Sequence, residues 1–316
     1  MSSSTAVSSA QQLAGAIGHT PLVELARYSR GSARIFAKLE WFNPGGSVKD
    51  RIALAMIEDA ERRGLLLPGG TIVEPTSGNT GVALAMLAAV RGYRCVIVMP
   101  AGYGQVKARL MEAFGAQVVR TPAETRMCGA IERAQQIARE TRGSYLPNQF
   151  SNPVNVQAHY TTTGPEIYGE LGTAIDAFVA GVGTTGTFTG VARYLSERIP
   201  RLHRAAAEPQ GSILGGGQQG PHAVEGIGLS FFPEIFDRSL IDEVVTIDDA
   251  TAFETCRTLA REEGLLAGGS SGVAAAAARR IAQRLGPGRT VVTVFPDGAE
   301  RYPNQGILED GLRSKV

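Results

Sequence analysis

Short apolar runs of strand length alternate along this chain with longer helix-like stretches, and glycines gather where one gives way to the other. Residues 95–99 (CVIVM) form one such run, which Pro100 ends, and residues 80–90 form an Ala- and Leu-rich stretch of helical length. Strands that alternate with helices in this way build mostly parallel sheets with helices on both faces. The pattern therefore predicts an α/β fold.

The same pattern can be followed through the whole chain. The expected strands lie at residues 35–39, 72–73, 95–99, 117–119, 177–182, 244–247 and 290–295, and the expected helices at 80–90, 106–114, 188–199, 249–263 and 273–285. A further amphipathic helix includes Ile52, Met56 and Ile57. At roughly 100–200 residues per domain, 316 residues make one large or two ordinary domains. Residues 1–10 are small and polar and predict a flexible terminus.

Composition excludes several classes of function. The formal net charge is +1, so no global field attracts nucleic acid or a membrane surface. The longest nearly apolar helix pattern, residues 82–90, is too short to span a bilayer. The three cysteines are far apart and the four histidines lack ligand spacing, so we expect neither a disulfide framework nor a metal site. A reducing, cytoplasmic location fits this cysteine usage.

The segment NPGGSVKDR, residues 43–51, holds a lysine in an unusual place. Ser47 is able to cap the helix that follows, which puts Lys49 in its first turn. The helix dipole disfavours a cation there. A lysine that forms a Schiff base beside a phosphate escapes that conflict. Taken alone, however, a solvated surface lysine is the commoner interpretation.

Residues 76–81 (TSGNTG) follow a strand pattern and precede a helix pattern. Backbone N–H groups at such a helix start suit an anion such as a carboxylate. A simple capping turn would explain any one of these residues, because Ser, Thr and Asn favour caps. It explains six polar or glycine positions in succession poorly.

Two more glycine-rich segments also stand before helix patterns. Residues 183–187 (GTTGT) combine glycines for close approach with hydroxyls for hydrogen bonds, as a phosphate-binding loop requires. They lack the ending of a Walker A loop and the spacing of a dinucleotide-binding loop, so alone they predict only an anion site. Residues 268–272 (GGSSG) alone favour a helix cap, and no nucleophile elbow with a histidine partner indicates a serine hydrolase.

In this order, the four segments resemble the cysteine synthase/cystathionine β-synthase family, which has the tryptophan-synthase-β-like fold (fold type II) of pyridoxal-phosphate enzymes. Further matching segments are IGHTPL at 17–22, HYTTTGPEI at 159–167, VEGIG at 224–228 and FPD at 295–297. The resemblance implies two three-layer αβα domains with mostly parallel sheets. It places a smaller, mobile domain at 49–155 and a larger one at 11–48 plus 156–316. A homodimer is also implied.

The resemblance further implies a role for each matching residue. Lys49 forms the Schiff base with pyridoxal 5′-phosphate, Asn79 hydrogen-bonds the ring hydroxyl, and Ser270 hydrogen-bonds the pyridine nitrogen. The remaining residues bind the cofactor phosphate (Gly183, Thr184, Thr185, Gly186 and Thr187), hold the substrate carboxylate (Thr76, Ser77, Gly78, Thr80 and Gln149) or approach the amino-acid substrate (Gly226).

These roles imply a reaction class. A serine at the pyridine nitrogen supplies no formal charge, so the ring nitrogen stays mostly neutral and the cofactor is a moderate electron sink. That suffices to expel a good leaving group from the β-carbon, with Lys49 as the base for the α-proton. Closure of the smaller domain over the carboxylate would exclude water.

The nucleophile is left open between sulfide and the thiol of homocysteine. HYTTTGPEI and GTTGT resemble cysteine synthase B, whereas residues 208–214 (EPQGSIL) and the following VEGIG resemble short bacterial cystathionine β-synthases. We favour O-acetylserine and sulfide as substrates, with phosphate or a bare hydroxyl as the alternative leaving groups on the serine. The alternatives are cystathionine synthesis, a serine or threonine dehydratase, and a non-catalytic partner that docks on serine acetyltransferase, as some family members do.

Overall fold

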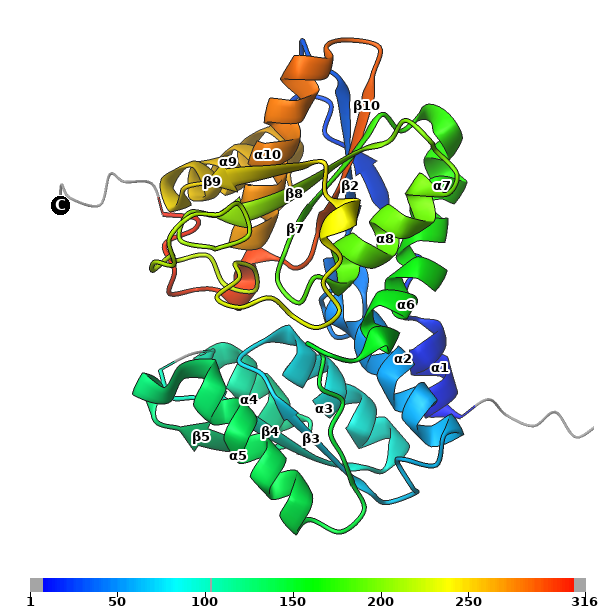
Figure 1. The fold of residues 1–316 in the computed structure, drawn as a ribbon, viewed down its shortest axis with the longest axis vertical. Coiled ribbons are helices and arrows are strands. Elements are labelled where there is room, and N and C mark those ends of the chain that lie inside the picture. Colours follow the sequence, from blue (N-terminus) through cyan, green and yellow to red (C-terminus); the bar gives the residue numbers. More distant parts are fainter. Residues whose placement is uncertain (1–7, 103, 310–316) are drawn as a thin grey trace, which may run out of the picture. The chain divides into compact units, whose positions relative to one another are not determined.

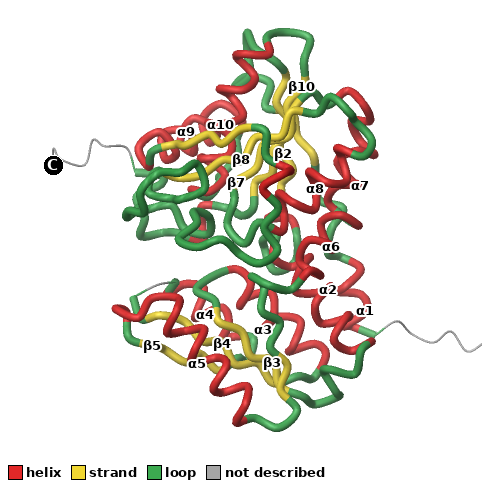
Figure 2. The backbone as a smooth tube through the Cα atoms, viewed as in Figure 1, coloured by secondary structure: helices red, strands yellow, loops and turns green. Residues whose placement is uncertain are grey.

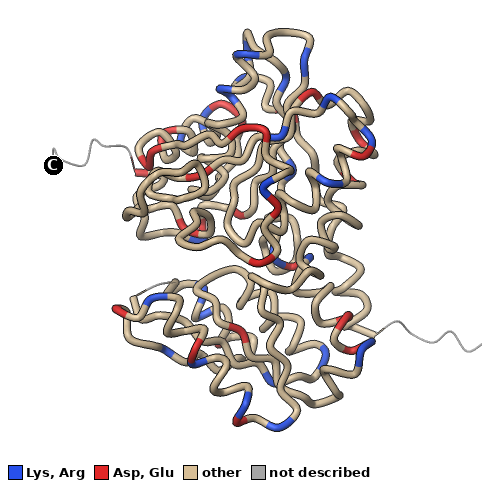
Figure 3. The backbone as a smooth tube through the Cα atoms, viewed as in Figure 1, with Lys and Arg blue, Asp and Glu red and all other residues tan. Residues whose placement is uncertain are grey.

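The computed structural model describes residues 8–102 and 104–309, which fold into two compact units (Figure 1). The first unit comprises the chain up to His19 and residues 43–148, and the second comprises residues 20–42 and the chain from Gln149 onward. Each unit has its own sheet and hydrophobic core. Basic and acidic residues are interspersed along both units (Figure 3), in keeping with the small net charge.

The first unit contains a four-stranded sheet in the order β5-β4-β3-β6, with all neighbours parallel. Its elements are α1 (Ser9–Gly15), α2 (Lys49–Arg62), β3 (Thr71–Pro75), α3 (Asn79–Arg91), β4 (Arg94–Pro100), α4 (Gln105–Ala113), β5 (Gln117–Thr121), α5 (Arg126–Glu140) and β6 (Ser144–Tyr145). Successive residues of a strand point to opposite faces. Ile72 accordingly packs with α2 and α3, while Val73 packs with α5.

The second unit contains a six-stranded sheet in the order β1-β2-β10-β7-β8-β9. Figure 2 draws its strands in yellow, among them β2, β7, β8 and β10. Only β1 runs antiparallel to its neighbour. The elements are β1 (Leu22–Glu24), β2 (Arg34–Leu39), α6 (Pro153–Thr161), α7 (Thr163–Leu171), β7 (Ala177–Gly181), α8 (Gly186–Ser196), β8 (His203–Pro209), β9 (Glu243–Ile247), α9 (Asp249–Glu263), α10 (Gly269–Leu285) and β10 (Thr290–Phe295).

The central strand β7 of this sheet is buried on both faces. Ala177 and Val179 pack with α9 and α10, whereas Phe178 packs with Phe188 and Val191 of α8. A strand covered by helices on both faces needs apolar residues at every position. This explains why the sequence shows continuous apolar runs rather than alternation.

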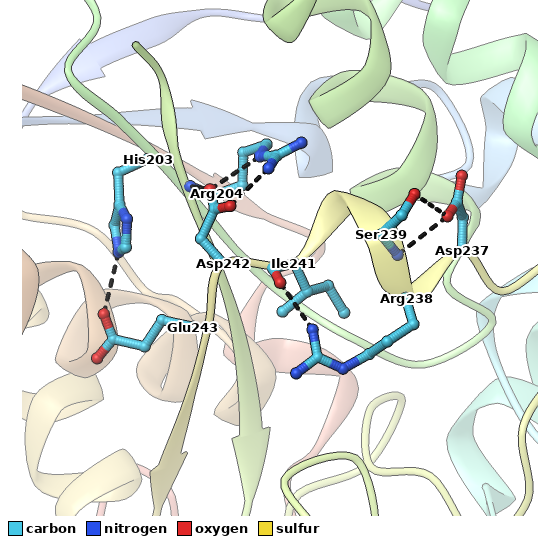
Figure 4. Close-up of polar contacts among 8 residues, drawn as sticks. All are labelled: His203, Arg204, Asp237, Arg238, Ser239, Ile241, Asp242 and Glu243. Atoms are coloured by element: carbon cyan, nitrogen blue, oxygen red, sulfur yellow. Dashed lines mark hydrogen bonds and ion pairs between the residues drawn. The ribbon is translucent and has the colours of Figure 1, made fainter.

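Polar contacts hold β8 to the edge strand β9 near the start of both strands (Figure 4). Arg204 donates to the Asp242 carboxylate through its backbone N–H and through Nε, both at 2.8 Å, and Nη2 lies 2.5 Å from Oδ1. These hydrogen bonds lower the pKa of the Asp242 carboxyl. His203 Nε2 lies 3.0 Å from Glu243 Oε2. The edge strand is thus anchored by side chains as well as by its backbone ladder.

The strands and helices predicted from the sequence are all present, with ends that differ by a few residues. Asp248 caps α9, since its side chain accepts from the N–H of Thr251. The α/β architecture with two mostly parallel sheets confirms the expected fold.

The terminus predicted to be flexible, residues 1–10, includes the start of α1. Residues 1–7 lie outside the described part of the chain, but Ser8 caps α1. The Ser8 hydroxyl accepts from the N–H of Gln11, and the Gln11 side chain accepts from the N–H of Ser8. This reciprocal capping box is encoded by a Ser-x-x-Gln pattern within a stretch that otherwise looks featureless.

The helix predicted from residue 273 begins four residues earlier, at Gly269. Residues 268–272 therefore do not form a loop before the helix, because most of them form its first turn. A Cβ atom on Gly272 would overlap the carbonyl of Ala252 in α9. Glycine here allows two helices to approach closely.

The two units differ at their margins from the ranges predicted for the two domains. The predicted ranges break at 48/49 and 155/156, whereas the units divide at 19/20, 42/43 and 148/149. Leu13 and Ile17 pack against the core of the first unit, which assigns the N-terminal segment to it. In the described ranges, no helix has both the length and the apolar character needed to cross a membrane.

Candidate active site

The GTTGT segment connects β7 to α8 in the second unit and contains a residue in an unusual conformation. Thr185 has φ 72°, a left-handed conformation that β-branched residues rarely adopt. It is 3% exposed, and its hydroxyl has no hydrogen-bond partner. Burying such a group without a partner costs about 1–3 kcal/mol. A phosphate oxygen at this position would offset that cost.

Helix α6 supports this loop from behind through Asn155. The side-chain nitrogen of Asn155 donates to the carbonyl of Gln149 at 2.8 Å and to Oγ1 of Thr184 at 3.1 Å. Because a backbone carbonyl only accepts, the nitrogen of the amide must face it. The Thr184 oxygen therefore receives a hydrogen bond, and its own proton is left for another acceptor. Asn155 is 1% exposed and was not predicted from the sequence.

The VEGIG segment, residues 224–228, lies directly against the GTTGT loop. A Cβ atom on Gly183 would overlap the carbonyl oxygen of Gly226, and the N–H of Gly228 donates to the carbonyl of Val182 at 2.9 Å. Gly226 has φ 87°. The segments expected to bind phosphate and to approach the substrate are therefore neighbours.

The start of α10 lies at the same end of this sheet. Ser270 is its second residue and is 3% exposed. A Cβ atom on Gly181, the last residue of β7, would lie 3.7 Å from the carbonyl oxygen of Ser270. Three glycine-rich segments thus converge at the carboxyl end of β7, where parallel sheets commonly bind ligands.

Lys49 is the first residue of α2 in the first unit, as predicted. Its backbone N–H lies 3.3 Å from the Ser47 hydroxyl, which accepts from it. The turn before it is fixed by the buried carboxylate of Asp50, which accepts from the N–H of Gly45 at 2.5 Å. A Cβ atom on Gly45 would meet that carboxylate at 2.5 Å, so this turn requires glycine.

Burial distinguishes Lys49 from the other lysines within the described part of the chain. Lys38 is 1% exposed and pairs with Glu166 and Glu170, and Lys107 is 2% exposed. Lys49 is only half-buried. Among the described lysines, Lys49 is therefore the one that is not fully buried.

The TSGNTG segment joins β3 to α3, and Gly78 is the residue before the first turn of the helix. The Thr76 hydroxyl accepts from the N–H of Gly78 at 3.3 Å. Thr76 and Thr80 are buried, while Ser77, Gly78 and Asn79 are half-buried. A Cβ atom on Gly78 would lie 3.9 Å from Cδ of Lys107, so this loop has a buried cationic side chain beside it that the sequence did not indicate.

The predicted site residues thus fall into two groups. The first unit holds Lys49, Thr76, Ser77, Gly78, Asn79 and Thr80, and the second holds Gln149, Gly183, Thr184, Thr185, Gly186, Thr187, Gly226 and Ser270. Within residues 8–102 and 104–309, no three His, Cys, Asp or Glu side chains gather to hold a metal ion. The protein thus has an α/β fold with a glycine-rich loop that holds a buried threonine hydroxyl in one unit, and a half-buried lysine at a helix start in the other.

Residues 13–297 match the family described as pyridoxal-phosphate dependent enzyme, and the chain belongs to this family. It is 48% identical to a cysteine synthase of Staphylococcus aureus over 289 residues, which is 90% of this chain and 93% of that protein. It is 46% identical to a cysteine synthase of Helicobacter pylori over 295 residues, 92% of this chain and 97% of that protein.

Solved structures show the same relationship. The chain is similar to an O-acetylserine dependent cystathionine β-synthase from Helicobacter pylori, with a TM-score of 0.90 and 46% identity over 93% of this chain and 97% of that one. It is also similar to an O-ureido-L-serine synthase, with a TM-score of 0.89 and 42% identity over 96% and 95% of the two chains. The family, the fold type and the cofactor expected from the sequence are confirmed.

The residues present fit this cofactor. The second unit offers the buried hydroxyl of Thr185, the free proton of Thr184 and the N-terminal N–H groups of α8 to a phosphate. In the first unit, Lys49 is half-buried at the start of a helix, and a lysine amine is the group that can bond to the cofactor carbonyl. Both groups of residues have the chemistry that the phosphate and the carbonyl of pyridoxal phosphate require.

Proposed function

We propose that this protein makes L-cysteine and acetate from O-acetyl-L-serine and sulfide. The observation that carries the proposal is the identity of 46–48% with cysteine synthases over nine-tenths of the chain, with every predicted glycine-rich loop intact. When bound, pyridoxal phosphate would supply an electron sink next to the α-carbon, which would ease loss of the proton there and of acetate from the β-carbon.

The chain's own residues bind the cofactor and the substrate, and one of them acts as a base. Lys49 links to the cofactor, and its released amine takes the proton from the α-carbon and later returns it. Residues 183–187 bind the phosphate, Asn79 hydrogen-bonds the ring hydroxyl, and Ser270 hydrogen-bonds the pyridine nitrogen without adding charge. A neutral partner at that nitrogen favours elimination at the β-carbon over transamination.

The substrate carboxylate is bound by a set of donors at the start of α3. These are the hydroxyls of Thr76, Ser77 and Thr80, in the same loop as Gly78. In the second unit, we expect the side chain of Gln149 to bind the carboxylate as well and Gly226 to leave room for the amino acid. Each hydrogen bond to a charged group contributes about 1.5–3 kcal/mol. Because the carboxylate is bound in both ground and transition states, loss of one donor should raise KM more than it lowers kcat.

Cystathionine synthesis is a second candidate. It is favoured by the similarity to the Helicobacter pylori enzyme that is named as an O-acetylserine dependent cystathionine β-synthase. Homocysteine differs from sulfide in needing polar groups for a second amino acid. A serine or threonine dehydratase is a third candidate, which release of pyruvate in the absence of any thiol would support.

The discriminating experiment offers O-acetylserine and O-phosphoserine each with sulfide and with homocysteine, and compares kcat/KM. We expect the highest value for O-acetylserine with sulfide. A higher value with homocysteine would make the protein a cystathionine synthase. A preference for phosphoserine would overturn the choice of donor.

The role of Lys49 has a separate test. Borohydride reduction of the loaded protein, followed by peptide mapping, should place the pyridoxyl group on Lys49 and leave Lys38 and Lys107 unmodified. Lys49→Ala should lose turnover and the visible absorbance of the linked cofactor while keeping its circular dichroism spectrum. A label on another lysine, or an active Lys49→Ala protein, would contradict the assignment.

We further propose that the protein is a cytoplasmic homodimer that has neither nucleic acid nor membrane lipid as a partner. The net charge of +1 supports the absence of a nucleic-acid partner. The cysteine usage fits a cytoplasmic location, and the dimer is carried over from the family resemblance. Sedimentation velocity tests the dimer, and pull-down with serine acetyltransferase tests the docking seen in some family members. Mobility of the first unit stays a prediction.

A further inference from the structure

The imidazole of His159 lies between two threonine hydroxyls in the second unit. Nδ1 is 2.9 Å from Oγ1 of Thr163, and Nε2 is 3.1 Å from Oγ1 of Thr187 in the GTTGT loop. His159 is fully buried, and Thr163 is too. It stands four residues after Asn155 on α6, so both side chains leave the same face of that helix.

Each hydrogen bond among His159, Thr163 and Thr187 needs one donor and one acceptor. A neutral imidazole has one N–H donor and one nitrogen acceptor, and each threonine hydroxyl has a single proton. If Nε2 accepted the Thr187 proton, the Thr187 hydroxyl would present only lone pairs to the phosphate. If Nε2–H donates instead, the Thr187 proton is free for a phosphate oxygen. An anionic phosphate needs the second arrangement.

Asn155 already imposes that arrangement on Thr184. Its amide nitrogen donates to Oγ1 of Thr184, which leaves the Thr184 proton for a ligand. Two buried side chains of α6 therefore contact two hydroxyls of the same loop from behind, one of them necessarily as a donor. His159 also acts as a donor, to the Thr187 hydroxyl, if its proton is on Nε2.

The packing of α6 on α8 keeps these atoms in place. A Cβ atom on Gly190 of α8 would overlap the carbonyl of Val156 and lie 2.7 Å from Cβ of His159. A Cβ atom on Gly186 would overlap the amide of Asn155. The two glycines allow α6 close enough for both side chains to reach the loop.

We propose that His159 is a positioning residue for the cofactor phosphate, held as the Nε2–H tautomer. Thr163 donates its proton to Nδ1, Nε2–H donates to Thr187, and Thr187 donates to the phosphate. This inference rests on the proposed function, because it takes residues 183–187 as the site of the cofactor phosphate. His159 touches neither cofactor nor substrate and acts only through Thr187.

The first test compares two amide substitutions. In His159→Gln the amide nitrogen reaches the position of Nε2 and can still donate to Thr187, whereas in His159→Asn the amide reaches only the position of Nδ1. Non-covalent affinity for pyridoxal phosphate is measured by equilibrium dialysis in a Lys49→Ala background. We expect His159→Asn to weaken binding about tenfold or more and His159→Gln to stay within a few-fold of the parent, as loss of one charge-assisted hydrogen bond predicts.

The phosphate itself is isolated by repeating the dialysis with pyridoxal. The affinity for pyridoxal should be equal in all three proteins, because it lacks the group that Thr187 binds. An equal loss of affinity for pyridoxal and for pyridoxal phosphate in His159→Asn would mean a general packing defect and would overturn the proposal.

A second variant guards against misfolding of His159→Asn. Thr163→Val removes the proton that holds Nδ1 as an acceptor and leaves Thr187 intact. We expect the phosphate-dependent part of the affinity to fall in this variant as well. An affinity unchanged from that of the parent would count against the relay.

The tautomer can be observed directly. In the loaded protein with ¹⁵N-labelled histidine, the His159 signals are those that vanish in the His159→Gln spectrum. We expect the proton on Nε2, and a proton on Nδ1 alone would overturn the inference while leaving the proposed function intact. Failure of the unsubstituted protein to bind pyridoxal phosphate would overturn both.

Discussion

Ser270 is the second residue of a 17-residue helix, so the proposed partner of the pyridine nitrogen is a neutral hydroxyl at the positive end of a helix dipole. Both properties oppose a proton on that nitrogen. We expect Ser270→Asp to add a negative charge that keeps the pyridine nitrogen of the cofactor protonated and slows β-replacement. The rate should fall about tenfold for each unit by which this charge raises the pKa of the nitrogen. The measurements are kcat and the pH dependence of the cofactor's absorbance.

Ser270→Ala is the matched control, because it removes the hydroxyl without adding charge. We expect it to shift the absorbance far less than Ser270→Asp does. If Ser270→Asp turned over at the unsubstituted rate, the charge at this nitrogen would not control the reaction.

The cysteines differ in reactivity for a physical reason. Burial raises the pKa of both Cys95 and Cys256 to about 12, so their reactive thiolate forms are scarce at neutral pH. Cys128 on α5 is exposed. We expect iodoacetamide to alkylate Cys128 alone in the folded protein at pH 8, as peptide mass mapping would show. Rapid labelling of Cys95 without urea would contradict the buried core of the first unit.

At the residue scale, the sequence predicted the groups that face a ligand and missed those that stand behind them. Lys49, TSGNTG and GTTGT are contiguous motifs, and contiguity is visible in a sequence. Asn155 and His159 matter because α6 packs on α8, and that packing pairs residues about 30 positions apart. The sequence held one signal for these two residues, which is the i, i+4 spacing of Asn155 and His159. Both are polar, and both are buried in the structure.

The contact of α6 with α8 depends on a glycine in the middle of a helix. A side chain at Gly190 would overlap the Val156 carbonyl, which belongs to the backbone and cannot rotate away. We expect Gly190→Ala to lower the free energy of unfolding by about 1–3 kcal/mol, the usual range for overpacking. It should also weaken cofactor binding. Urea denaturation and dialysis measure the two effects.

Gly169 on α7 serves as the control, because nothing lies within 4 Å of a Cβ atom there. Alanine has the higher helix propensity, so Gly169→Ala should be neutral or stabilise by up to about 1 kcal/mol. Equal destabilisation by both substitutions would mean that the α6–α8 contact is not the cause.

At the element scale, strands with long apolar runs were predictable, whereas the alanine-rich strand β8 and several helices were not. A strand covered on both faces must be apolar throughout, and such runs stand out. Helix α6 has no apolar stripe, since Asn155 and His159 occupy buried positions on it. Its start was still encoded, because Asn152 caps it and Pro153 is its first residue. Helix ends thus carried information that hydrophobic periodicity lacked.

At the scale of the whole molecule, a single tryptophan reports on one unit. Trp41 belongs to the second unit, and its ring stacks on Phe295 of β10 with centroids 6.2 Å apart. Its fluorescence should follow unfolding of the unit that holds the phosphate loop. In Lys49→Ala, pyridoxal phosphate at 100 times its dissociation constant should stabilise that transition by about 2.7 kcal/mol. Pyridoxal at the same concentration should stabilise the second unit less. Equal increases in its free energy of unfolding would argue against phosphate binding in that unit.

The division into two units was implied by the family resemblance, while the path of the chain between them was not. Sequence patterns find strands but not their order in a sheet. Nothing in the apolar run of residues 35–39 indicates that β2 pairs with β10, whose residues are some 250 positions away. Nor does local sequence show that α1 packs with α3 in the first unit.

This pairing of β2 with β10 has a consequence during translation. Synthesis at about 5–20 residues per second separates the two strands by roughly 10–50 s. By then the ribosome has completed residues 43–148 together with α1, so the first unit has all the residues of its core. The apolar side chains of β2, including Ile35 and Leu39, lack their principal partner strand throughout that interval. The nascent second unit is therefore the part of the chain that needs protection from aggregation until its last strand emerges.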